Sequence, residues 1–159
     1  MNNKMVQDIV DNLILTDKTI SFAESCTGGR IASAFTSISG VSTVFNGSCV
    51  TYSNEIKHNW LGVSNEVLDN YGAVSKECVS LMLKGIKNMA NSDYAIAVSG
   101  IAGPTGGTKL KPVGTVYIGV SISNDEFIKK YLFFGDRNEV QKQATDMAIK
   151  ILSKKILKI

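Results

Sequence analysis

One short apolar segment near the middle of the chain most constrains the fold. Residues 94–98 read Tyr-Ala-Ile-Ala-Val, so both alternating faces of this segment are almost free of polar side chains. A strand that is apolar on both faces is typical of the centre of a sheet covered by helices on both sides. We therefore expect a layered α/β structure with this segment as a central strand.

Hydrophobic periodicity predicts the elements around that strand. Helices are expected over residues 4–15, 31–38 and 75–90, and residues 54–61 are helical or turn-like. After a capping pattern at 136–139, a closing helix should direct Val140, Ala144, Met147, Ile151 and Leu152 inward. Further strands are expected at residues 19–23, 48–53, 115–123 and 127–134.

The order of these elements predicts the fold class. Residues 124–126, Asn-Asp-Glu, separate the last two strands and read as a hairpin, which forces at least one antiparallel pair. Helices alternate with the earlier strands, which favours parallel pairing there. The sequence therefore predicts a three-layer α/β/α sandwich around a mixed, mostly parallel sheet of about five strands.

Size and composition narrow the function classes. The 159 residues, 44% of them hydrophobic and 19% charged, suit one globular domain spanning 1–159. The net charge of +3 is too small and too scattered to indicate a nucleic-acid partner. No apolar run reaches the ~18 residues that a membrane span needs, and the N-terminus lacks the apolar region of a signal peptide.

The cysteines indicate the compartment. Cys26, Cys49 and Cys78 are odd in number and widely spaced, which is typical of free thiols in a reducing environment. They also lack metal-ligand spacing, and His58 is the only histidine that could join them. We expect a cytoplasmic protein with no metal, and with no nucleic-acid or membrane partner. A thiol dyad of Cys26 or Cys49 with His58 is a weaker alternative.

A turn of small residues follows the strand expected at 19–23. Residues 23–29 read Ala-Glu-Ser-Cys-Thr-Gly-Gly, which puts Ser25 at the carboxyl end of a strand, where open α/β sheets bind ligands. The N–H groups of Thr27, Gly28 and Gly29 should be free, and they could bind a phosphate or stabilise an oxyanion. An N-cap and tight turn without catalytic function would need the same residue types.

A nucleophilic serine needs a base, and the base here could be a lysine. Tyr52 and Lys57 lie in the segment Thr-Tyr-Ser-Asn-Glu-Ile-Lys at 51–57. Burial or a nearby cation, with His58 and Arg137 as candidates, could lower the pKa of Lys57 from ~10.4 toward ~7–8. Taken singly, Tyr52 is better explained as an aromatic residue at the end of a strand, and Lys57 as a solvated lysine.

A glycine- and proline-rich loop follows the central strand. Residues 99–115 contain five glycines and both prolines of the chain, and they match neither the P-loop nor the Rossmann pattern. A loop of this length inside a domain is more often functional or disordered than a simple connection. We therefore favour a functional loop over a flexible crossover.

Together these segments resemble the CinA C-terminal domain family, whose stand-alone members are nicotinamide-mononucleotide deamidases of the PncC type. The resemblance covers essentially the whole chain. It rests on six segments in order: Ala-Glu-Ser-Cys-Thr-Gly-Gly at 23–29, Tyr-Ser-Asn-Glu-Ile-Lys at 52–57, Gly-Ala-Val-Ser at 72–75, Gly-Ile-Ala-Gly-Pro-Thr-Gly-Gly at 100–107, Lys-Pro-Val-Gly-Thr at 111–115 and Phe-Gly-Asp-Arg at 134–137.

The resemblance implies an amidase that needs no metal and no cofactor. It would hydrolyse the carboxamide of nicotinamide mononucleotide to nicotinate mononucleotide and ammonia, in pyridine nucleotide salvage. Ser25 would attack, Lys57 would remove its proton and Tyr52 would assist. Substrate binding would fall to Thr27, Gly28, Gly29, Thr105, Gly106 and Gly107, with Arg137 as the phosphate partner. The resemblance also implies a homo-oligomer, with a dimer favoured.

Some features depart from the family pattern. Gln141 stands where many members carry an arginine, and Arg30 stands where an apolar residue is common. If that arginine holds the phosphate in the family, Gln141 is expected to weaken phosphate binding or to alter the choice of substrate. The N-terminal domain of some relatives is absent, so the chain is expected to be the short, single-domain form. The alternative function is a non-catalytic nucleotide-binding module that acts through a partner. The complete set of Ser25, Tyr52 and Lys57 favours the enzyme, because a binder has no evident need for all three.

Overall fold

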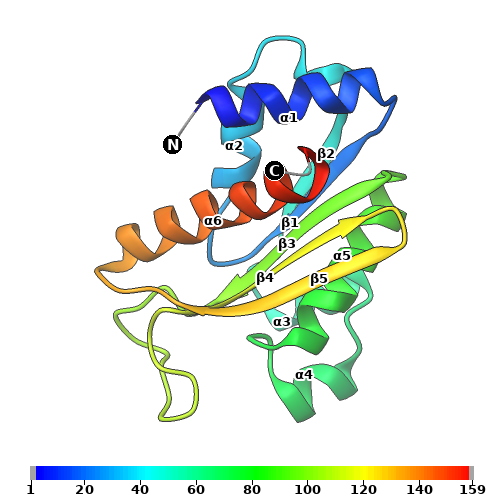
Figure 1. Ribbon diagram of the computed structural model, residues 1–159. Coiled ribbons are helices and arrows are strands. Elements are labelled where there is room, and N and C mark those ends of the chain that lie inside the picture. The colour runs from blue at the N-terminus through cyan, green and yellow to red at the C-terminus, as the bar shows by residue number, and fades with distance from the viewer. Residues whose placement is uncertain (1–2, 158–159) are drawn as a thin grey trace.

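The computed structural model describes residues 3–157, which form a five-stranded sheet with helices on both faces (Figure 1). The strands are β1 (Ile20–Glu24), β2 (Phe45–Val50), β3 (Tyr94–Gly100), β4 (Thr115–Ile122) and β5 (Asp125–Leu132). The helices are α1 (Asn3–Leu15), α2 (Arg30–Thr36), α3 (Asn54–Leu61), α4 (Asn65–Tyr71), α5 (Lys76–Ala90) and α6 (Arg137–Leu157), with a 3₁₀ turn η1 (Val41–Thr43).

The strand order β2-β1-β3-β4-β5 makes the sheet mixed. β1 pairs in parallel with both β2 and β3, whereas β4 is antiparallel to both β3 and β5. The five inner residues of β3 are all buried, so the apolar segment is the central strand that the sequence predicts. The carboxyl ends of β1, β2 and β3 therefore meet at one edge of the sheet.

Two separate cores hold the three layers together. One lies under α1, α2 and α6, and it includes Phe22, Phe35 and Leu152. The other lies under α3, α4 and α5, and it includes Met82 and Leu83. Figure 1 shows α1, α2 and α6 on one face of the sheet and α3, α4 and α5 on the other. The predicted α/β/α sandwich is confirmed.

Most predicted elements are confirmed, but the bounds of two strands were wrong and one helix was missed. β5 occupies Asp125–Leu132 and not 127–134, because Asp125 already pairs with Ile122 and only residues 123–124 form the hairpin turn. β2 begins at Phe45 and ends at Val50, not at 48–53, because Phe45 stacks against Phe22 while Ser53 already caps α3. Helix α4 was not predicted, although Ser64 caps it by accepting a hydrogen bond from Val67 N–H. None of the helices among residues 3–157 is both long and apolar enough to cross a membrane.

The capping pattern before the last helix forms as predicted. The Glu139 carboxylate accepts from the N–H of Asp136 at 2.7 Å, and the Asp136 carboxylate accepts from the N–H of Glu139 at 2.9 Å. This reciprocal pair satisfies two donors that a helix start otherwise leaves free. It fixes the point at which α6 begins, and therefore the position of Arg137.

Helices α3 and α5 cross closely at Gly85. A Cβ at this position would lie 2.0 Å from the carbonyl oxygen of Leu61, which is the last residue of α3. A glycine inside a helix lowers the stability of the helix by about 1 kcal/mol relative to alanine. The close packing of α3 on α5 that this glycine permits compensates that loss. Because α3 also carries Lys57, this crossing places that lysine against the sheet.

Candidate active site

Ser25 lies directly after β1, at the edge where the parallel strands end. Its N–H donates to the carbonyl of Val98 in β3 at 3.0 Å, which continues the ladder by one residue. Helix α2 begins five residues later, at Arg30. The predicted strand, turn and helix around this serine are confirmed, and Ser25 is only 7% exposed.

Lys57 reaches Ser25 from α3, 32 residues further along the chain. Its Nζ lies 3.1 Å from Ser25 Oγ, 2.8 Å from the carbonyl oxygen of Thr51 and 3.3 Å from that of Tyr52. The side chain is 1% exposed. Burial lowers the pKa of Lys57, because removing an ammonium from water disfavours the charged form.

The three partners of Nζ determine what the neutral amine can do. The two carbonyl oxygens can only accept, so they take two N–H groups of the amine. A neutral amine has two N–H groups and one lone pair, and the lone pair is then left facing Ser25 Oγ. In this state Lys57 can accept the proton of the serine hydroxyl. The geometry therefore matches a serine nucleophile with a lysine base.

The alternative thiol dyad has no support. Burial raises the pKa of Cys26 to about 12 and that of Cys49 to about 11, so neither sulfur is a ready nucleophile. Nδ1 of His58 lies 2.8 Å from the carbonyl oxygen of Val63, which holds the ring in the loop after α3. Among residues 3–157, no cluster of three or more His, Cys, Asp or Glu side chains is arranged to hold a metal ion.

Glu24 is a buried carboxylate that sequence reasoning missed. One of its oxygens accepts from Thr27 Oγ1 at 2.7 Å and from the N–H groups of Gly29 and Ile31, and the other accepts from Ala32 N–H at 2.9 Å. A charged residue at the end of an apolar strand was the available signal. These bonds tie the start of α2 to β1 and hold the turn that carries Ser25.

The same bonds correct the prediction about free N–H groups in the turn. Gly28 N–H donates to the Ser25 carbonyl at 3.1 Å, and Gly29 N–H donates to Glu24. Within residues 3–157 the N–H of Thr27 has no acceptor, whereas the N–H of Cys26 interacts with the sulfur of its own side chain. Thr27 is buried, so its N–H lies inside the protein, in the turn that carries Ser25.

Arg137 joins two of the predicted segments at the mouth of the site. Its guanidinium donates to the hydroxyl of Tyr52 and, at 2.7 Å, to the carbonyl oxygen of Gly103 in the glycine-rich loop. Both Tyr52 and Arg137 are exposed. The carbonyl of Tyr52, and not its hydroxyl, is the group that contacts Lys57.

The outer part of the glycine-rich loop makes no hydrogen bond to Ser25 or Lys57. Thr105, Gly106 and Gly107, which form this part, are exposed. The loop is tied down elsewhere by Lys111, whose Nζ donates to the Tyr71 carbonyl at the end of α4 at 2.7 Å. Substrate binding by this part of the loop stays a prediction.

Gln141 is a second residue whose contact with the Ser25 turn the sequence did not reveal. Its side chain is 7% exposed, and its amide donates to the Cys26 carbonyl oxygen at 2.9 Å. The residue was noted only because it replaces an arginine, with weaker phosphate binding as the expected consequence. Its amide instead bonds to the backbone of the turn that carries Ser25.

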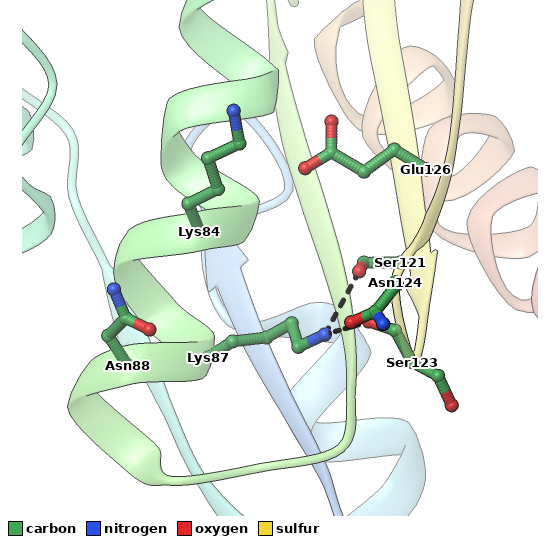
Figure 2. A pocket seen from close by; sticks show the side chains of 7 residues that line it. All are labelled: Lys84, Lys87, Asn88, Ser121, Ser123, Asn124 and Glu126. Carbon is green, nitrogen blue, oxygen red and sulfur yellow. Dashed lines mark hydrogen bonds between the residues drawn. The ribbon is translucent and has the colours of Figure 1, made fainter.

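A polar pocket of about 300 Å³ lies at the opposite end of the sheet (Figure 2). Its lining residues are Lys84, Lys87, Asn88, Ser121, Ser123, Asn124 and Glu126. Lys87 already donates to Ser121 Oγ at 3.3 Å and to the Ser123 carbonyl, as the dashed lines in Figure 2 show. The Lys87–Ser121 contact differs from the Lys57–Ser25 contact in burial, because Lys87 is half-buried whereas Lys57 is buried.

Comparisons with known proteins identify the family of the chain. The model of the family described as "CinA C-terminal domain" matches residues 2–156. A CinA-like protein from Fervidobacterium nodosum is 48% identical over 159 residues, which are 99% of this chain and 39% of that protein. A CinA-like protein from Petrotoga mobilis is 50% identical over 140 residues, or 88% of this chain and 35% of that protein.

Solved structures show the same fold over full-length matches. A CinA superfamily protein from Klebsiella pneumoniae superposes with a TM-score of 0.94 at 34% identity, covering 100% of this chain and 99% of the other. A competence/damage inducible protein from Agrobacterium tumefaciens gives a TM-score of 0.91 at 34% identity, covering 94% and 92%. The chain spans about two fifths of the length of the curated relatives it matches. It belongs to the CinA C-terminal domain family.

Proposed function

We propose that the chain is a serine amidase that hydrolyses the carboxamide of nicotinamide mononucleotide to nicotinate mononucleotide and ammonia. One observation carries the proposal: Lys57 Nζ lies 3.1 Å from Ser25 Oγ in a buried site, with its other contacts being carbonyl oxygens. A solvated lysine would stay protonated at neutral pH and could not act as a base. Burial of Lys57 lowers its pKa and so favours the neutral amine.

The first half-reaction would form an ester on the serine. Ser25 Oγ attacks the carboxamide carbon while its proton passes to Lys57 Nζ. The free N–H of Thr27 stabilises the oxyanion that develops. Collapse of this intermediate breaks the C–N bond, and Lys57 returns the proton to the departing ammonia.

The second half-reaction would restore the enzyme. Water attacks the ester carbon and gives a proton to Lys57. Lys57 then returns a proton to Ser25 Oγ, which leaves as the free hydroxyl. The second product is the nicotinate carboxylate. Each acid–base step uses the same lysine, so one buried amine supports both half-reactions.

Recognition of the nucleotide would use the exposed side of the site. Two of the guanidinium N–H groups of Arg137 donate to Tyr52 and Gly103, so the other N–H groups remain for a phosphate. Tyr52 accepts from Arg137, which leaves its own hydroxyl proton free to donate to the substrate and so to assist as the resemblance implies.

Assembly into a dimer also stays a prediction.

The deciding experiment measures ammonia release from nicotinamide mononucleotide in the presence of a chelator. Wild type should release ammonia, Ser25→Ala should not, and Ser33→Ala should match wild type because Ser33 is an exposed serine on α2. Ser25→Ala should still bind the nucleotide. Near-normal turnover by Ser25→Ala would rule out the acyl-enzyme. Binding without turnover by wild type would favour the non-catalytic nucleotide-binding module.

A further inference from the structure

Three carbonyl groups of the Ser25 turn are held inside the protein. The Ser25 carbonyl accepts from Gly28 N–H, and the Thr27 carbonyl accepts from the N–H of Arg30 at 3.2 Å and from its guanidinium at 3.1 Å. The Cys26 carbonyl accepts from Gln141 at 2.9 Å. The N–H of Thr27 and the carbonyl of Gly28 have no hydrogen-bond partner within residues 3–157.

Planarity of the peptide links the Gln141 bond to one of those free groups. The Cys26 carbonyl and the Thr27 N–H belong to the same peptide unit, and in a trans peptide they point in opposite directions in one plane. Gln141 binds the carbonyl end of this unit. Fixing that end therefore fixes the direction of the Thr27 N–H at the other end.

Gln141 is well placed to fix the peptide firmly. It projects from α6, 115 residues away in sequence, and is almost fully buried, so water does not compete for the bond. The acceptor is a carbonyl, which cannot donate, so the glutamine must present its amide nitrogen. The neighbouring Thr27 hydroxyl is held by Glu24, which limits movement on the other side of the same peptide.

We propose that Gln141 is a positioning residue: it holds the Cys26–Thr27 peptide so that the Thr27 N–H is directed at the oxyanion formed during acyl transfer to Ser25. The inference deepens the proposed function and rests on it. It gives Gln141 a purpose other than the phosphate contact expected for an arginine at this position. Gln141 touches neither substrate nor Ser25 and acts only through the backbone.

The first test is Gln141→Met, which keeps the length of the side chain and removes the donor. Turnover should fall roughly 10- to 100-fold, since a lost or misdirected oxyanion donor has about this effect on kcat. KM for the nucleotide should change less than about threefold, because the ground-state carboxamide depends little on that N–H. Gln141→Glu, similar in shape, repeats the test if the methionine variant does not fold.

The matched control is Gln143→Met on the same helix. Gln143 is half-buried, and its amide also donates to carbonyl oxygens, those of Phe134 and Glu139, but not to the Ser25 turn. This variant should keep the kcat of wild type. An equal loss in both variants would show that any missing glutamine bond on α6 weakens the enzyme, and it would overturn the proposal.

Two further readouts separate this inference from the choice of substrate. The amide ¹H and ¹⁵N resonances of Thr27 should move in Gln141→Met and stay in place in Gln143→Met. Phosphonylation of Ser25 by a fluorophosphonate, which also needs the oxyanion donors, should slow roughly tenfold or more in Gln141→Met only. If wild type reacts with the probe but not with the nucleotide, the substrate proposal fails and the role of Gln141 stands.

Three outcomes overturn the role of Gln141. One is an unchanged kcat together with an unchanged rate of phosphonylation in a folded Gln141→Met. Another is a Thr27 amide resonance that does not respond to the loss of the glutamine. The third is a wild-type Ser25 that reacts with neither nucleotide nor fluorophosphonate, which removes the acyl transfer on which the role depends.

Discussion

Tyr52 and Lys57 are five residues apart in the chain, and yet their side chains lie in opposite environments. Lys57 is 1% exposed and contacts Ser25, whereas Tyr52 is 58% exposed and contacts Arg137. Burial alters the acid–base behaviour of the lysine, as its lowered pKa shows. One short segment therefore contributes one residue to a buried pair, Ser25–Lys57, and one to an exposed pair, Tyr52–Arg137. In the proposed function the buried pair carries out the chemistry and the exposed pair recognises the substrate.

The largest expected effect tests the buried pair. Lys57→Met should lower kcat by ~10²-fold or more, because it removes the proton acceptor and keeps an unbranched chain of similar length. KM for nicotinamide mononucleotide should stay within about threefold of wild type if the lysine acts on the serine and not on the substrate. Steady-state ammonia release measures both constants.

The control for that variant is Lys76→Met, which replaces an exposed lysine on the first turn of α5. It should leave both constants unchanged. If Lys57→Met instead raises KM and spares kcat, the buried pair serves binding, and the division between chemistry and recognition breaks down.

The pH dependence should follow the same lysine. In the proposed mechanism neutral Lys57 is the active form, so kcat/KM should rise about tenfold per pH unit until the pH passes the lowered pKa, which lies below 10.5. Between that pKa and 10.5 the unfolded chain binds a proton that the folded chain does not, so folding stability should rise with pH there. The free energy of unfolding, compared with Lys57→Met across this range, measures the second effect. A rate that is flat with pH would contradict the assignment.

A smaller effect is expected from the exposed pair. Arg137→Lys keeps the positive charge but loses the planar array of donors, so it should raise KM for the nucleotide roughly tenfold while kcat changes little. Nicotinamide riboside, which lacks the phosphate, serves as the control substrate, because its KM should not depend on the residue. A fall in kcat equal to the rise in KM would give Arg137 a part in the chemistry.

The smallest effect is expected from Tyr52→Phe. The change removes one hydroxyl that pairs with Arg137 and can donate to substrate, and such a bond contributes about 0.5–1.5 kcal/mol, or roughly 2- to 10-fold in kcat/KM. Wild type and variant should be compared in the same assay as Lys57→Met. A loss as large as that of the lysine variant would move Tyr52 from the recognition pair into the catalytic machinery.

Local patterns in the sequence predicted the framework well. The apolar segment at 94–98 identified the central strand, and the acidic pair at 136 and 139 identified the start of α6. These features depend on neighbours along the chain. The start of β2 was misplaced because Phe45 owes its position to packing on Phe22 from β1, and residues 43–50 do not reveal that contact.

The candidate site was predictable only in part. Ser25 and Lys57 were identified, and the structure brings them together. Glu24 and Gln141 were missed as parts of the site, since their importance comes from backbone groups that they contact in the folded chain. The partner of Gln141 is 115 residues away, and no local pattern records a hydrogen bond over that separation.

Gly85 lies outside the candidate site but affects the position of a residue in it. It has no side chain and no place in the chemistry, but any side chain there would collide with the end of the helix that carries Lys57. A mutational scan scored on ammonia release would therefore mark Gly85 as intolerant of every replacement, like a catalytic residue. A companion scan scored on protein abundance would tell the two apart, because the chain can fold without Ser25 but must reposition a helix to accommodate alanine at 85.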